Sequence, residues 1–303
     1  MNKIIIMMNK HFLIIGFMLL FINCKNSKKN QALTTEYLGS LSQNVKERSK
    51  KRVKYLELTG LFKLDSATNT FGKNPSNDFV LDIDYLPSNL GSITLSKNGL
   101  DFNSLGNSQI NDGLGNQVDS FNLDIDTDGN SIMLYFKFLK WQVITRSGAL
   151  YLRLWDTKNP AVKAFKGFNS FEAKSEFIIE GDFKYYKSKH TESVSSKLGI
   201  NDNTDFIGKV EFAYKDKSYS LDVGSQGFTM VGDLTSGEST YGGGRYLYLD
   251  LPETDGTVSL DFNYLYNPPC AFSEFTTCLF PPRQNQLPIE IKAGERIEKH
   301  FNF

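Results

Sequence analysis

Histidine and cysteine are scarce in this sequence, which has 303 residues and only three of each. The histidines, His11, His190 and His300, are scattered along the chain. A structural zinc site needs four ligands at close spacing, and no such cluster is present. We therefore expect no bound metal and no cofactor.

An excess of charge of either sign is also absent. The chain has 34 basic and 34 acidic side chains, so its formal net charge is zero. A nucleic-acid-binding protein usually carries a strongly basic surface. The balance therefore argues against nucleic acid as a partner.

No apolar run is long enough for a membrane-spanning helix, which needs about 20 residues. An apolar run without charge covers 12–22, and it follows the basic residues Lys3 and Lys10. A basic start followed by a short apolar core is typical of a secretion signal. The first segment, 1–23, is therefore predicted to be a signal peptide.

Cys24 directly follows this apolar core. The context resembles a lipobox, in which the cysteine becomes the lipid-bearing N-terminus of a bacterial lipoprotein, although Phe21 and Asn23 depart from the commonest residues. We expect export, a lipid anchor on Cys24 as the contact with the membrane, and a polar tether over 24–34. Because Lys25 is not an aspartate, the outer membrane of the cell envelope is favoured. The alternative is an ordinary secretion signal with an incidental cysteine.

Lipid on Cys24 would leave an even pair of cysteines, Cys270 and Cys278. Seven residues separate them, and an exported protein meets oxidising conditions. We predict a disulfide between them, with a metal site as the alternative that the scattered histidines disfavour.

A helical period covers 35–56, where apolar residues such as Leu38, Leu41 and Val45 recur at helical spacing among many charges. We interpret the charges as the solvated face of an amphipathic helix. Contact with anionic lipid is the alternative.

The pattern changes to alternation after Gly60, and Asn98-Gly99 between alternating runs is a strong hairpin signal. About a dozen short strands with polar turns predict a mainly β fold, a β-sandwich or barrel-like body behind a short N-terminal helix. The expected strands include 92–95, 100–102, 132–138, 141–144, 150–155, 210–214, 219–223, 245–249, 258–262 and 287–292.

The segment 187–205 is polar and poor in large apolar residues. We interpret it as a linker or long loop between an N-terminal β region, 57–186, and a C-terminal β region, 206–303. A long loop inside one double-sheet domain is the alternative.

Short motifs are concentrated between Asp233 and Glu295. In order they are Thr235-Ser236-Gly237, Thr240-Tyr241-Gly242-Gly243-Gly244-Arg245, Leu260-Asp261-Phe262-Asn263, Tyr266-Asn267-Pro268-Pro269-Cys270-Ala271-Phe272, Thr277-Cys278, Pro281-Pro282, Asn285-Gln286-Leu287 and Ala293-Gly294-Glu295. This run resembles the uncharacterised bacterial family known as domain of unknown function 1684. Weaker correspondences extend the resemblance upstream to about Val53. The family implies no established activity.

Arg245 follows three glycines, which suit a sharp turn or a close approach to a ligand. Its planar fork of donors fits a carboxylate or phosphate, but it can equally pair with Asp233 or Asp261. On the strand 258–262, alternation puts Asp261 and Asn263 together on the polar face, either as a site or as a capped turn. Tyr241 and Asn267 complete the candidate ligand-binding residues, with core packing and turn formation as their alternatives.

No complete catalytic motif is present, because the motif-rich stretch contains no histidine and no serine in an elbow motif. We therefore favour an envelope binding module for a small anionic or carbohydrate-like ligand. One alternative is a hydrolase that uses Asp233 or Asp261 as acid or base. The other is a structural envelope interaction protein. Whether the chain is an enzyme stays open at this point.

Overall fold

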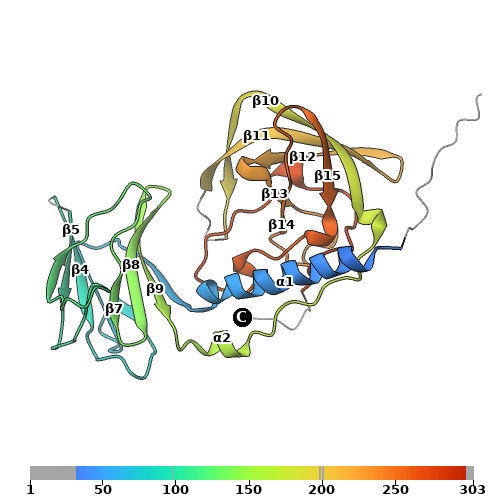
Figure 1. Cartoon of the computed structure of the whole chain (residues 1–303). Helices are drawn as coiled ribbons and strands as arrows, with labels where there is room; N and C mark the ends of the chain where they lie inside the picture. The colour runs from blue at the N-terminus through green and yellow to red at the C-terminus, as the bar shows by residue number, and fades with distance from the viewer. Residues whose placement is uncertain (1–31, 98, 198, 200, 298–303) are drawn as a thin grey trace, which may run out of the picture.

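The N-terminal half of the described chain is a β-sandwich (Figure 1). The structure is a computed structural model that describes residues 32–97, 99–197, 199 and 201–297. One sheet has the order β1-β9-β8-β7 and the other the order β3-β2-β4-β5-β6. The strands are β1 (Leu58–Lys63), β2 (Thr68–Gly72), β3 (Phe79–Val80), β4 (Gly91–Ser96), β5 (Gly99–Ser104), β6 (Ser120–Asn122), β7 (Leu134–Phe136), β8 (Leu139–Arg146) and β9 (Ala149–Asp156).

Aromatic residues from both sheets fill the sandwich core. Trp141 of β8 is fully buried, and its ring lies 5.6 Å from that of Phe71 and 5.8 Å from that of Phe102. Both phenylalanines belong to the facing sheet and are also fully buried. Alternation along each strand turns these residues inward, because successive side chains point to opposite faces.

The C-terminal half is a second β unit with its own buried cluster. Four antiparallel strands have the order β12-β11-β10-β15, and β13 pairs separately with β14. These strands are β10 (Ile178–Ser195), β11 (Asn201–Tyr214), β12 (Lys217–Gly224), β13 (Phe228–Val231), β14 (Arg245–Tyr248) and β15 (Gly256–Asp261). Short 3-10 turns are η1 (Ser175–Phe177), η2 (Ser225–Gly227), η3 (Phe262–Tyr264), η4 (Pro269–Ala271) and η5 (Arg283–Asn285).

Helix α1 (Thr35–Leu56) has the predicted bounds and lies along one side of the C-terminal unit (Figure 1). Its N-cap Thr34 accepts a hydrogen bond from the Tyr37 amide at 3.1 Å, which satisfies one of the free amides of the first turn. The short helix α2 (Pro160–Ala164) packs beside its C-terminal end, through Ala161 and Val162.

The fold is mainly β, as predicted, but no sheet of the described residues closes into a barrel. No helix in the described part of the chain combines the length and the apolar character needed to cross a membrane. The predicted signal peptide and residues 24–31 of the predicted tether, including Cys24, lie outside the described residues.

The segment 187–205 is not a loop, contrary to the sequence-based prediction. Most of it lies in β10 and β11, which pair as far as Ser195 and Asn201 (Figure 1). Lys189 and Thr191 both contact Asp205 across the pair, at 2.5 and 2.6 Å. Apart from the buried Val194, most side chains of this segment are polar and exposed, so the apolar alternation that signals a strand is missing.

The predicted strand 287–292 was also wrong, because no strand forms there. The carbonyl groups of Ile291 and Ala293 accept hydrogen bonds from the Arg245 side chain. Since buried backbone groups need partners, a side chain here supplies what a neighbouring strand would otherwise supply. The predicted strand 132–138 is shorter than expected and reduces to β7.

Candidate functional site

Arg245 lies fully buried in the core of the C-terminal unit. Its side chain is 0% exposed, as is that of its partner Asp233, and their Nη2 and Oδ2 atoms are 2.8 Å apart. Nη2 also donates to the carbonyl of Ile291 at 2.8 Å, and Nη1 donates to the carbonyls of Ala293 and Glu295. Burial lowers the pKa of the guanidinium, against the raising effect of Asp233.

Both carboxylate oxygens of Asp233 accept hydrogen bonds, because the second oxygen holds the Thr235-Ser236-Gly237 turn. Oδ1 accepts from the amide of Thr235 at 2.8 Å and from its hydroxyl at 2.5 Å. The Thr235 hydroxyl in turn lies 2.9 Å from that of Thr240. This network engages both carboxylate oxygens of Asp233, and it favours the structural interpretation of the first two motifs.

Asp261 and Asn263 form a capped turn, one of the two predicted possibilities. Asp261 ends β15 and accepts from the Asn263 amide at 3.0 Å, which caps η3. Its other oxygen accepts from the Tyr37 hydroxyl of α1 at 2.7 Å. Burial raises the pKa of the Asp261 carboxyl, and the hydrogen bonds from Tyr37 and Asn263 oppose that shift. Asn263 itself is held by the backbone of Lys174.

Glu295 joins the last motif to α1 and to Asn267. Its Oε2 accepts from Nη2 of Arg52 at 2.6 Å and from the Asn267 amide at 2.8 Å. Arg48 lies 3.9 Å from the other oxygen. The Arg52 guanidinium is also stacked against aromatic rings, at 4.8 Å from Phe168. This cluster attaches α1 to the C-terminal unit through buried charge.

A pocket of about 510 Å³ lies where α1 faces the C-terminal unit. We call it the α1 pocket. Its α1 wall consists of Asn44, Glu47, Arg48, Lys51, Arg52, Lys54 and Tyr55. Its opposite wall consists of Phe228, Tyr246, Tyr248, Tyr266, Asn267, Pro269 and Phe272.

The α1 pocket combines cations with aromatic faces. Four of its lining residues are basic and only Glu47 is acidic. The Arg48 guanidinium lies 4.1 Å above the Tyr266 ring, and burial lowers the pKa of this guanidinium. Tyr248 stacks with Tyr266 at 6.4 Å and 7° and is 58% exposed. An anionic group can therefore meet the cations while a ring or sugar face meets Tyr248.

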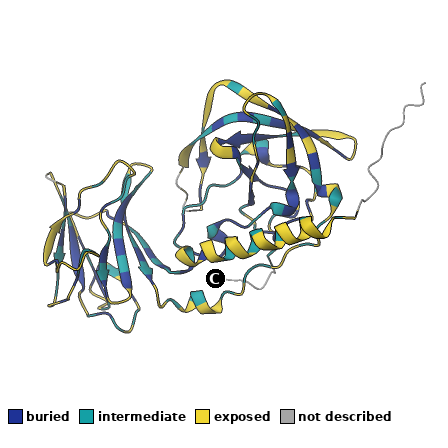
Figure 2. Ribbon diagram, viewed as in Figure 1, coloured by how far each residue is buried: buried dark blue, intermediate teal, exposed yellow. Residues whose placement is uncertain are grey.

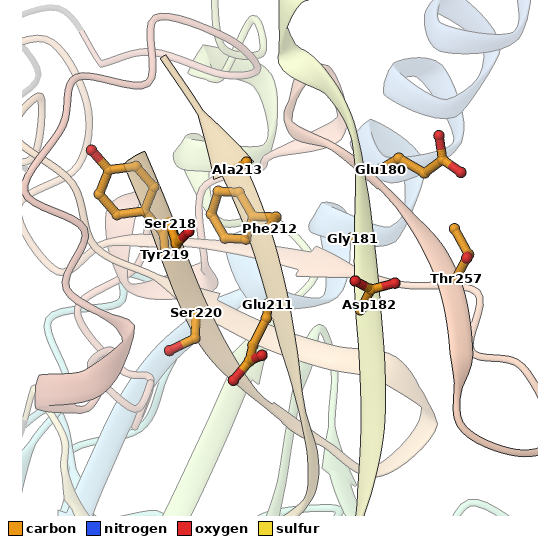
Figure 3. A pocket seen from close by; sticks show the side chains of 10 residues that line it. All are labelled: Glu180, Gly181, Asp182, Glu211, Phe212, Ala213, Ser218, Tyr219, Ser220 and Thr257. Atoms are coloured by element: carbon orange, nitrogen blue, oxygen red, sulfur yellow. The ribbon is translucent and has the colours of Figure 1, made fainter. Parts of the chain in front are cut away.

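Other pockets are larger but offer fewer kinds of side chain that could bind a ligand. One of about 750 Å³ covers the outward faces of β10, β11, β12 and β15 (Figure 3). Its carboxylates, on Glu180, Asp182 and Glu211, are distributed over two strands, and Glu211 pairs with Lys209 at 2.6 Å. It contains no basic residue and none of the family motifs. Within the described residues, no group of three or more His, Cys, Asp or Glu side chains could hold a metal ion.

Of the six predicted ligand residues, only Asn267 lines the α1 pocket. Arg245 and Asp233 pair with each other, and Asp261 and Asn263 form the capped turn. The half-buried Tyr241 packs in the cluster that contains Phe272, and burial raises its pKa. No cleft brings Asp233 and Asp261 together, so the geometry lends the hydrolase alternative no support.

Cys270 and Cys278 are adjacent but are both free thiols in the structure. The amide of Cys270 donates to Sγ of Cys278 at 3.0 Å, and the amide of Cys278 donates to Sγ of Cys270 at 3.1 Å. The hydrogen bond from the Cys278 thiol lowers the pKa of Cys270 to about 7. The disulfide stays a prediction. Counting free thiols before and after treatment with oxidised glutathione would check it, with no loss of thiols as the contrary result.

Apart from Asn267, sequence reasoning did not single out the residues that form this pocket. Arg48, Lys51 and Lys54 stood in the charge run that was interpreted as a solvated face, and Tyr248 stood at the end of a strand. A usable signal was present: Arg48 and Arg52 share a helical stripe with Tyr37 and Leu41, which are half-buried.

The site and fold thus define a β protein with a pocket between a helix and the C-terminal sheets, and without an assembled catalytic set among the described residues. Residues 163–296 match the family model described as "Protein of unknown function (DUF1684)". This part of the chain therefore matches the model of an uncharacterised family, the one that its motifs indicated. The upstream correspondences and α1 lie outside the matched range.

Similarity to solved structures and to curated proteins is weak or absent. An uncharacterised protein of Haloarcula marismortui, solved in solution by NMR, is 24% identical, with a TM-score of 0.39 over 46% of this chain and 80% of that one. A likeness at that score carries no argument here. No curated protein matches the chain.

Proposed function

We propose that this chain is an exported lipoprotein, anchored in the outer membrane by lipid on Cys24, whose C-terminal unit binds a small anionic ligand with a ring or sugar face. The observation that carries the binding function is the α1 pocket, with its basic wall on α1 and its tyrosines opposite. The anchor is supported by the apolar run 12–22 directly before Cys24. Metabolic labelling with palmitate checks it, and equal labelling of Cys24→Ser would contradict it.

A thermal-shift comparison of defined probes tests the pocket. Glucose 6-phosphate and glucuronate carry both an anion and a ring, glucose carries only the ring, and inorganic phosphate carries only the charge. A probe at 100 times its dissociation constant adds about 2.7 kcal/mol to the free energy of unfolding. We expect the first two probes to raise the melting temperature more than the last two.

Two pocket variants should weaken this binding without weakening the fold. Lys51 and Tyr248 are both exposed, so replacing either with alanine should change stability by less than about 0.5 kcal/mol. Lys51→Ala removes a charged donor and should raise the dissociation constant about tenfold. Tyr248→Ala removes a stacking face and should have an effect of similar size, about tenfold, whereas Tyr248→Phe keeps the ring.

Lys50→Ala is the matched control, because Lys50 is an exposed lysine on the same helix that does not line the pocket. It should bind as the unaltered protein does. If none of the four probes stabilises the protein, or if Lys50→Ala weakens binding as much as Lys51→Ala, the proposed site is wrong.

A further inference from the structure

Exposed lysines are concentrated on the two helices beside the C-terminal unit. Residues 46–54 of α1 hold six basic side chains and one acidic side chain, and residues 158–166 hold three basic and no acidic ones. The whole chain is neutral. These two short segments therefore carry a positive excess that the rest of the chain balances with negative charge.

The arrangement on α1 separates two sets of cations. Arg48 and Arg52 face the core and approach Glu295. Lys46, Lys50 and Lys54 follow one another at four-residue spacing, which places them in one row along the helix, and Lys54 at the end of this row also lines the α1 pocket. All three are exposed, and Figure 2 shows exposed residues along the side of α1 that faces away from the sheets.

Helix α2 extends the basic region. It packs on the C-terminal end of α1 through Ala161 and Val162, and Lys163 and Lys166 are exposed. We call Lys46, Lys50, Lys51, Lys54, Lys163 and Lys166 the lysine face. Among the described residues 46–54 and 158–166, Glu47 is the only acidic side chain near it, and Gln43 donates to that carboxylate at 2.9 Å.

From this charge distribution we infer that the lysine face binds the surface of an anionic phospholipid bilayer. Basic residues near such a surface are attracted by its negative potential, and the attraction falls off within a Debye length. The inference rests on the proposed lipid anchor for its setting. The tether 24–34 can reach at most about 40 Å, which keeps α1 close to the bilayer that holds Cys24.

Cosedimentation with vesicles tests the surface without the anchor. The chain from Asn30 onward keeps every described residue and lacks Cys24 and the tether lysines. It should bind vesicles that contain phosphatidylglycerol and should not bind pure phosphatidylcholine vesicles. Raising the salt to about 1 M, where the Debye length is about 3 Å, should release it.

A triple variant, K46Q/K50Q/K163Q, should lower the vesicle partition coefficient about 100-fold, at roughly fivefold for each lysine removed. None of these lysines lines the α1 pocket. K184Q/K187Q/K217Q removes three exposed lysines from β10 and β12 and is the matched control. Melting temperatures of both triple variants should equal that of the unaltered protein.

The result is separable from that of the proposed function. Tyr248→Ala should bind vesicles normally, because four of the six lysines of the lysine face, Lys46, Lys50, Lys163 and Lys166, do not line the pocket. The inference is overturned if the protein does not bind vesicles that contain phosphatidylglycerol. It is also overturned if the control triple variant loses as much vesicle binding as K46Q/K50Q/K163Q, or if only Tyr248→Ala loses vesicle binding. If the purified chain binds vesicles but the chain carries no lipid on Cys24 in cells, the lysine face is supported as a membrane-binding surface and the proposed anchor is rejected.

Discussion

Arg245→Ala is expected to destabilise the C-terminal unit by about 3–5 kcal/mol, the cost of removing one partner of a buried ion pair. Asp233 would then keep its charge at a position that is 0% exposed. The carbonyls of Ile291 and Ala293 would lose donors in the same step. Urea denaturation followed by tryptophan fluorescence and circular dichroism measures the loss.

A double variant distinguishes the ion pair from the space it fills. In Arg245→Met with Asp233→Leu no charge is left unpaired, so the loss of stability should be smaller than in Arg245→Ala. Asp233 also holds the Thr235 amide and hydroxyl, so some loss remains. A single variant as stable as the unaltered protein would show that the network contributes nothing and would return Arg245 to the list of ligand residues.

Arg52→Ala has the second large expected effect, because it detaches α1. Glu295 is 2% exposed and would keep only the Asn267 amide and the more distant Arg48 as partners. The aromatic rings around Arg52 would lose a cation as well. We expect a loss of about 3–5 kcal/mol. Hydrogen exchange should show faster exchange at α1 amides than at those of the sandwich core.

Lys51→Ala supplies the comparison on the same helix turn. Lys51 is exposed, and its loss should leave α1 exchange unchanged. Glu295→Gln keeps an acceptor for the Arg52 side chain and should be milder than Arg52→Ala. Unchanged exchange in Arg52→Ala would mean that the other contacts of α1, such as the Tyr37–Asp261 hydrogen bond and the packing of Leu56, suffice to attach the helix.

These two buried networks account for several of the polar residues in and beside the C-terminal motifs. Asp233, Thr235 and Arg245 form one network, and Asn267 and Glu295 belong to the other. Arg245 connects them through the carbonyl of Glu295, at 3.2 Å. The motifs therefore hold the end of the domain together, and the exposed chemistry lies beside them in the α1 pocket.

Local features were predictable from the sequence. The helix 35–56 follows from its apolar spacing and its Thr34 cap, and the turn at Lys215-Asp216 follows from two alternating runs around polar residues. Family resemblance follows from the order of short motifs, which needs no structure. Such features depend on neighbours within a few residues.

The long hairpin of β10 and β11 was not predictable in this way. Its outer part, 187–205, is mostly polar and exposed, and Val194 is its one buried apolar side chain among the described residues. Backbone pairing and contacts such as Lys189 with Asp205 hold it instead. Amphipathic alternation reports burial on one face, so a strand exposed on both faces gives no such signal.

The sequence by itself determined the mainly β class, the N-terminal helix and the family of the C-terminal domain. Only the tertiary structure decided that Arg245 is core and that Arg48, Lys51 and Tyr248 line a pocket. The physical reason is sequence distance: Arg245 contacts partners up to 50 residues away, and Arg52 meets Glu295 across 243. Whether a cation is exposed depends on which distant carboxylate the fold brings to it.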